Sequence, residues 1–231
     1  MIDLQGFGAQ LLVGTALTIE LAFASAALGM LIGLGLAGLK LSRSRLGRGL
    51  ADLFTTVFRG VPELIIVLLV YFGASIALTN LSDLFGGEDP VELHPFLAGT
   101  LAMGLAFGAY ASEVFRGALQ ALPRGQVEAA RAFGMSRSLA FRRIGLPQMW
   151  RFALPSLGNI FLVLLKDTSL VSVIGLEELM RKTAIAVSNT KEPFTFYLAA
   201  AGIFLAMTVV SMIGLGALER RANRGVARVA R

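Results

Sequence analysis

Five long apolar stretches constrain this chain more than any other feature of its sequence. They cover about residues 11–39, 61–79, 96–115, 152–176 and 194–218. A helix needs about 20 apolar residues to cross the hydrocarbon core of a bilayer, and each stretch meets or approaches that length. The first stretch is too long for the apolar part of a signal peptide, so we interpret it as a retained span. The sequence predicts an all-α integral membrane protein with five transmembrane helices, in a single transmembrane domain over residues 1–231.

The distribution of charge predicts how these spans are oriented. Segments 40–59, 116–151 and 219–231 hold 17 of the 21 Lys and Arg residues, whereas segment 80–95 holds four acidic residues and no Lys or Arg. Positive charge stays on the cytoplasmic side of a membrane, so we expect the N-terminus outside and the C-terminus inside. The basic segments lack an aromatic or base-reading pattern, which argues against nucleic-acid binding.

Several kinds of site are excluded by composition. The chain has no cysteine and a single histidine, His94, which argues against a disulfide frame, a thiolate metal site and a zinc enzyme. No glycine-rich phosphate loop followed by Lys-Ser or Lys-Thr occurs. We therefore expect no catalytic residue, no metal site and no cofactor in this chain.

Two pairs of glycines predict close contacts between helices. Gly29 and Gly33 stand four residues apart, as do Gly104 and Gly108. Small residues at this spacing let helix backbones approach each other. We favour ordinary packing between helices as the interpretation, and the pattern does not distinguish self-association from pairing with another subunit.

A basic segment at about residues 124–147 predicts a helix, a tight turn and a second helix on the membrane surface. Ala129 and Ala130 favour the first helix, and Gly134 is a natural C-terminal stop. Ser136 suits the N-cap of the second helix, which we expect to end at Pro147. Ala130 and Gly134 share a nearly bare face that another surface could approach closely, although basic helices also lie on anionic lipid.

The same segment carries a motif that resembles the EAA signature of permease subunits of ATP-binding-cassette (ABC) importers. Its seven positions stand at the usual spacing: Glu128, Ala129, Ala130, Gly134, Ile144, Leu146 and Pro147. The resemblance implies that the first helix is a coupling helix, which docks in a cleft of the ATPase. Glu128 also lies in the first turn of that helix, where the helix dipole favours an anion.

Further motifs extend the resemblance over nearly the whole chain. The stretches RGVPEL (59–64), GAYASEVFRGAL (108–119) and KDTSLVSVIGLEEL (166–179) look like the polar amino acid branch of that family. The stretches EPFTFY (192–197) and LERR (218–221) look like its histidine, arginine, lysine, ornithine and opine permeases. The resemblance implies the type I ABC importer permease fold, with five helices per subunit, in the bacterial inner membrane.

Ionisable residues inside the predicted spans are the candidates for a substrate pathway, because burying charge in a membrane is expensive. Lys166 is the fifteenth residue after Arg151, which places it roughly 22 Å from the inner face. Lys166 and Asp167, followed by Thr168 and Ser169, could line a polar cavity. A structural ion pair or a contact to a partner subunit is an equally open interpretation.

Two glutamates are weaker candidates for the same pathway. Glu113 stands one helical turn from Arg116, so we favour an i,i+3 ion pair between them. Glu20 lies at the outer boundary of the first span or deeper, where an unpaired acid would favour a cationic substrate. Arg59 and Glu63 mark the inner end of the second span.

The resemblance also implies a function and a set of partners. The chain is expected to translocate a polar, basic amino acid from the periplasm, which makes the N-terminus periplasmic and the C-terminus cytoplasmic. Its partners would be an ABC ATPase dimer that binds ATP and Mg²⁺, a second homologous permease or a second copy of itself, and a periplasmic amino-acid-binding protein. The alternatives are import of an opine or a neutral amino acid, and a membrane interaction protein without transport. The seven-position motif and the charged pair in the fourth span argue against the last.

Overall fold

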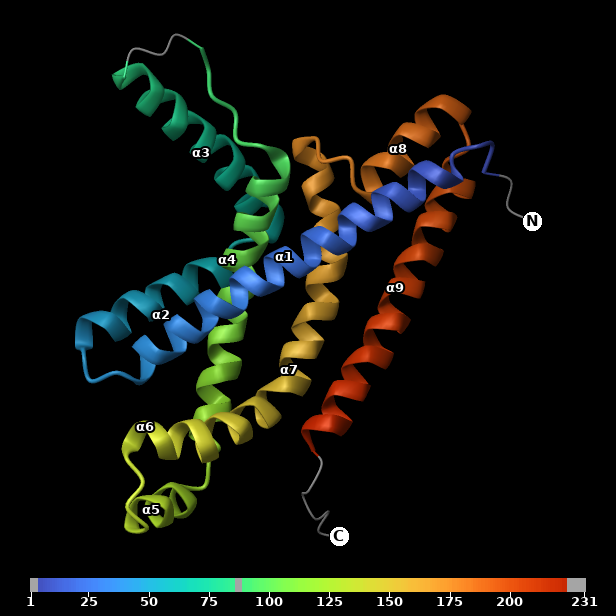
Figure 1. Ribbon diagram of the computed structural model, residues 1–231. Helices are drawn as coiled ribbons and strands as arrows, with labels where there is room; N and C mark the ends of the chain where they lie inside the picture. Colours follow the sequence, from blue (N-terminus) through green and yellow to red (C-terminus); the bar gives the residue numbers. More distant parts are fainter. Residues whose placement is uncertain (1–3, 86–88, 224–231) are drawn as a thin grey trace.

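The computed structural model describes residues 4–85 and 89–223, and helices make up its architecture (Figure 1). The α-helices, in chain order, are α1 (Gly8–Leu41), α2 (Arg45–Gly60), α3 (Glu63–Leu84), α4 (Pro95–Gln120), α5 (Arg124–Ala132), α6 (Arg137–Ala140), α7 (Leu146–Asp167), α8 (Leu179–Thr190) and α9 (Pro193–Ala222). A π-helical turn, Phe141–Gly145, joins α6 to α7, and a 3-10 segment, Thr168–Ile174, follows α7.

Five helical segments of the described chain are long and apolar enough to cross a membrane. They are Gly8–Leu41, Glu63–Leu84, Pro95–Gln120, Arg137–Ile174 and Pro193–Ala222. The prediction of an all-α membrane protein with five spans is therefore confirmed. The second helix begins two residues later than expected, because Pro62 occupies its N-cap and a proline fits a helix only at its start.

The core of the subunit forms where α1 crosses α4, near the centre of Figure 1. The two predicted glycine pairs meet each other at this crossing. A Cβ atom on Gly29 would lie 2.8 Å from the backbone oxygen of Gly104, and one on Gly108 would lie 2.8 Å from the side chain of Ile32. The glycine pairs thus pack helices within one subunit, which settles an alternative that the spacing alone left open.

This crossing predicts a large effect from a single side chain. Gly29→Leu should lower the yield and the thermal midpoint of the purified protein, because the new Cβ meets backbone atoms that cannot rotate away. Overpacking a tight core costs about 1–3 kcal/mol. Gly35→Leu on the same helix is the matched control, since no described atom outside the adjoining backbone of α1 lies within 4 Å of a Cβ placed there. Equal midpoints for the two variants would contradict this account of the core.

A second contact fixes α8 against the first half of α1 and buries a carboxyl group. Glu178 caps α8 by accepting a hydrogen bond from the Arg181 amide at 3.0 Å, and Thr18 donates to its Oε2 at 3.3 Å. Gly14 leaves room for this junction, because a Cβ there would lie 3.0 Å from the Glu178 backbone. Glu178 is fully buried, and burial raises the pKa of its carboxyl from an ordinary 4.5 to about 7.

Because of the Glu178 carboxyl, we expect the stability of the folded protein to depend on pH. A carboxyl with a raised pKa binds its proton more tightly in the folded state, so its stabilising effect is lost as the pH rises from about 4.5 to about 7. The thermal midpoint of the purified protein should be higher at pH 5 than at pH 8, and Glu178→Gln should reduce this difference. Glu177→Gln, at an exposed neighbour, should retain the difference. The same pH response in both variants would contradict the assignment.

Candidate substrate and coupling sites

Two carboxylates from distant parts of the chain line one cavity of about 210 Å³. Glu63 is the first residue of α3, and Asp167 is the last residue of α7, where the helix changes from α to 3-10. Tyr110 of α4 also lines this cavity and interacts electrostatically with both. The rest of the wall is apolar and comes from α4 and α7: Met103, Ala106, Phe107, Ile160, Val163 and Leu164. Two acids in an apolar wall suit a cation.

The neighbours of Asp167 contribute less to this cavity than the sequence predicts. Lys166 is exposed and does not line the cavity, and among the described residues no ion pair joins it to Asp167. Thr168 donates its hydroxyl to the carbonyl of Leu165 at 2.8 Å, and Ser169 donates to the carbonyl of Lys166 at 2.7 Å. Neither hydroxyl lines this cavity, because the tight 3-10 turn directs both to the backbone of the preceding turn. Their place in the substrate pathway stays a prediction.

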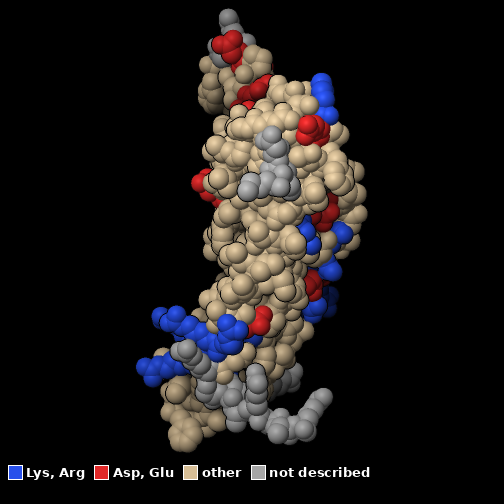
Figure 2. Space-filling view, turned by 90° about the vertical axis from the view of Figure 1, so that its right-hand side faces the viewer, with Lys and Arg blue, Asp and Glu red and all other residues tan. Residues whose placement is uncertain are grey.

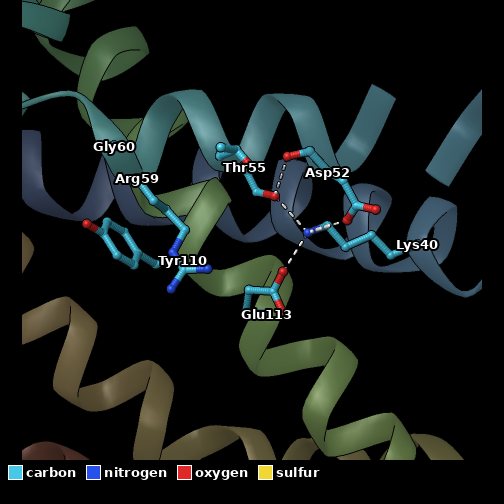
Figure 3. Close-up of a pocket in the computed structure, with 8 residues that line it drawn as sticks. Lys40, Asp52, Thr55, Arg59, Gly60, Tyr110 and Glu113 are labelled. Atoms are coloured by element: carbon cyan, nitrogen blue, oxygen red, sulfur yellow. Dashed lines mark hydrogen bonds and ion pairs between the residues drawn. The ribbon is translucent and has the colours of Figure 1, made fainter. Parts of the chain in front are cut away.

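A second cavity, of about 550 Å³, opens beside α2 and contains an ion network (Figure 3). The Lys40 ammonium, in the last turn of α1, lies 3.1 Å from Asp52 Oδ1 and 2.5 Å from Glu113 Oε1. It also donates a hydrogen bond to Thr55 Oγ1 at 2.7 Å. The Lys40 side chain is only 5% exposed, and two carboxylates compensate its charge. The network ties α1, α2 and α4 together.

The weaker sequence candidates lie outside the cavity that contains Asp167. Glu113 forms the predicted i,i+3 pair with Arg116, which donates from Nη2 to Glu113 Oε2 at 2.6 Å. The sequence did not reveal Lys40 as the second partner of Glu113. Glu20 lines a third cavity, of about 430 Å³, together with His94 and Glu177.

Helix α2 is the main element that the sequence analysis missed. The sequence analysis describes its residues only as part of the basic segment 40–59. Ser44 nevertheless caps a helix of 16 residues by accepting from the Gly47 amide at 3.1 Å. Asp52, Thr55 and Arg59 recur at helical spacing and line the same cavity, which is the periodicity of an amphipathic helix. That periodicity and the Ser44 cap were visible in the sequence and could have predicted α2.

The EAA motif is spread over three helical segments at one end of the subunit (Figure 1). Glu128 and Ala129 are exposed on α5. Ile144 is half-buried in the π-helical turn, whereas Leu146 and Pro147 are exposed at the start of α7. The predicted end of a helix at Pro147 is wrong: the chain stays helical from Arg137 to Ile174. A proline is tolerated there because the first turn of α7 needs no amide donor.

The turn after α5 presents one large aromatic side chain. The amide of Met135 donates to the carbonyl of Ala130, and that of Gly134 donates to the carbonyl of Arg131, which is the Schellman pattern of helix termination. Gly134 has a φ of +82°, as this turn requires. Phe133, at the C-cap of α5, is 89% exposed.

The predicted bare face of Ala130 and Gly134 needs correction. Ala130 is only 5% exposed, because α5 packs this side against α6 and the π-helical turn. Gly134 is exposed, and its role in the structure is to form the turn. The surface of α5 that is open to a partner therefore contains Phe133 rather than Ala130.

Comparisons with known proteins agree with this architecture. Residues 29–224 match the family described as "binding-protein-dependent transport system inner membrane component". The histidine/lysine/arginine/ornithine transport system permease protein HisQ of Escherichia coli K12 is 44% identical over 97% of this chain and 98% of its own length. The nopaline transport system permease protein NocQ of Agrobacterium fabrum is 47% identical over 96% of this chain and 94% of its own length.

Solved structures show the same fold. A crystal structure of an amino acid ABC transporter with histidines superposes with a TM-score of 0.77 at 35% identity, covering 92% of this chain and 94% of that one. An inward-facing MetNI methionine ABC transporter superposes with a TM-score of 0.74 at 16% identity, covering 94% and 98% of the two chains, which supports the fold alone. The predicted type I importer permease fold is thereby confirmed. The chain belongs to the family of inner membrane components of binding-protein-dependent transport systems and is a permease subunit of an ABC importer.

Proposed function

We propose that this permease translocates amino acids with a cationic side chain. The observation that carries the proposal is the pair Glu63 and Asp167, which face one cavity with an apolar wall and no lysine or arginine among its lining residues. Two carboxylates in a site of low dielectric constant favour a bound cation and repel an anion. The names of relatives that carry histidine, lysine, arginine and ornithine support the same class of substrate.

The partners follow from the family. We propose that an ABC ATPase dimer binds ATP and Mg²⁺ and docks on α5, with Phe133 as an apolar contact. A second permease subunit, homologous or identical, would face this one across the pathway, and a periplasmic amino-acid-binding protein would deliver the substrate. The chain itself would bind neither ATP nor metal.

An orientation with the N-terminus periplasmic and the C-terminus cytoplasmic is supported by the surface charge. In Figure 2, Lys and Arg gather at the end that holds the first turns of the fourth span, whereas Asp and Glu dominate the opposite end. Positive residues favour the cytoplasmic side of the inner membrane. The exposed α5 would then face the cytoplasm, where the ATPase is.

Cysteine labelling tests this orientation, and the chain has no cysteine of its own. Asp89→Cys should react with a membrane-impermeant maleimide added to intact spheroplasts, and Arg221→Cys should react only after permeabilisation. Both positions are exposed, so access to the reagent decides the result. Labelling in the reverse pattern would overturn the orientation.

Substrate-stimulated ATP hydrolysis by the reconstituted complex tests the substrate class. Arginine, lysine, ornithine and histidine, each with a binding protein that accepts it, should stimulate hydrolysis, whereas glutamate should not. Stimulation by glutamate or by a neutral amino acid at the same level would overturn the proposal.

An arginine-derived opine is the second candidate substrate. The 47% identical relative is named for nopaline transport, and an opine that keeps a guanidinium would also suit the two carboxylates. Stimulation by such an opine, and not by arginine, would favour this candidate.

A further inference from the structure

The cavity beside α2 is lined by two cations and two acids, and a third cation, Arg116, approaches one of these acids from outside. Its charged lining residues are Lys40, Asp52, Arg59 and Glu113. Lys40 contacts both acids, and Arg116 contacts the remaining oxygen of Glu113 from outside the cavity. Each Glu113 oxygen therefore contacts a cation, and Arg59 forms no ion pair in this network.

Arg59 is the cation without an acidic partner. Among residues 4–85 and 89–223, no carboxylate lies within ion-pair distance of its guanidinium, although Asp52 and Glu113 line the same cavity. Its guanidinium carbon lies 5.4 Å from the centre of the Tyr110 ring. Figure 3 shows the side chain extending from α2 toward that ring, into the cavity. Stacking on an aromatic ring leaves the edge of the guanidinium free to donate two parallel hydrogen bonds.

Tyr110 connects this cavity with the one that contains the acid pair. It lines both, and it interacts electrostatically with Arg59 as well as with Glu63 and Asp167. A molecule that carries a carboxylate at one end and a cation at the other would thus meet an arginine in one cavity and two acids in the other, with Tyr110 common to both. An amino acid with a cationic side chain has this distribution of charge.

We infer that Arg59 binds the α-carboxylate of the transported amino acid while Glu63 and Asp167 bind its cationic side chain. This inference rests on the proposed function and adds an orientation of the substrate to it. A carboxylate side chain of the second permease subunit has the same chemistry as the substrate's carboxylate, so the test has to separate these two sources.

Agmatine, which is arginine without its carboxylate, provides the test. Binding of radiolabelled L-arginine and of agmatine would be measured on the whole transporter in nanodiscs, without binding protein. Arg59→Gln should weaken L-arginine binding at least tenfold and change agmatine binding less than twofold, because agmatine has no carboxylate to lose. Arg59→Lys should weaken L-arginine binding less than Arg59→Gln does, because the lysine ammonium keeps the positive charge. Arg48→Gln, at an exposed arginine on the same helix, should change neither ligand.

Uptake into liposomes gives a second measurement of the same contact. With external binding protein saturated by L-arginine, Arg59→Gln should lower uptake at least tenfold at an unchanged yield of complex. Equal losses for L-arginine and agmatine, or normal L-arginine binding and uptake, would overturn the inference. Loss of the second permease subunit on purification would also overturn it and would assign the contact to that subunit.

Glu63→Gln should weaken the binding of both ligands alike. If it changed the binding of neither, the proposed cation site would fail independently of Arg59.

Discussion

Asp167→Asn should lower uptake of a basic amino acid at least tenfold while the yield of assembled transporter stays normal. Asparagine keeps the size of the side chain and removes the charge that would compensate a cation inside the membrane. A charge-assisted hydrogen bond contributes about 1.5–3 kcal/mol, which corresponds to about ten- to a hundredfold in binding. Uptake into liposomes at saturating binding protein, with complex yield measured in parallel, would check the prediction.

Matched variants separate a substrate contact from a structural one. Lys166→Gln changes the neighbouring charge, which does not line the cavity, and should leave uptake within about twofold of the wild type. Asp167→Asn combined with Glu63→Gln should cost less than the two single losses multiplied, because both carboxylates act on one bound cation. Wild-type uptake by Asp167→Asn would remove Asp167 from the pathway, and a fall in complex yield would assign it a structural role.

The sequence singles out Asp167 as a pathway candidate and does not single out Glu63, for a physical reason. A charge within an apolar run of the fourth span is conspicuous, since hydropathy is a property of neighbours along the chain. Glu63 follows a proline at the start of a helix, where an acid also stabilises the helix dipole. Only the packing of α3 and α7 against α4 places Glu63 in the cavity that contains Asp167. Local patterns thus predict the helices, and tertiary contacts decide which polar residues meet.

The glycines illustrate the same division at two positions. The spacing of Gly29 and Gly33 predicts a close helix contact but does not identify the partner helix, which is α4. Gly134 was correctly predicted to end a helix, because that requires only a residue that tolerates a positive φ. The prediction that Gly134 shares a bare docking face with Ala130 depends on which surfaces pack together, and the burial of Ala130 contradicts it.

Phe133→Asp should release the ATPase from the complex. Phe133 makes few contacts within its own chain, so its replacement should leave the fold and the membrane insertion intact. Burying a phenylalanine contributes roughly 1.5–3 kcal/mol, and aromatic anchors carry a large share of binding energy in interfaces. Loss of this side chain, together with the cost of burying a carboxylate in its place, should weaken ATPase binding by more than tenfold. Co-purification of the ATPase with the tagged permease would measure the effect.

The choice of Phe133, rather than its neighbour Gly134, makes this result interpretable. A bulky residue at Gly134 would strain the turn through its φ of +82°, so its failure would not distinguish lost docking from a distorted helix end. Phe194→Asp is the matched control, because Phe194 is also exposed, at 80%, and lies in the first turn of α9, where the helix dipole favours an acid. That variant should retain the ATPase.

If α5 only rested on lipid, the five spans would still anchor the permease, and both variants would co-purify with the ATPase equally. Such equality would refute the assignment of α5 as the coupling element, whereas selective loss with Phe133→Asp would establish the aromatic contact through which ATP binding reaches the spans.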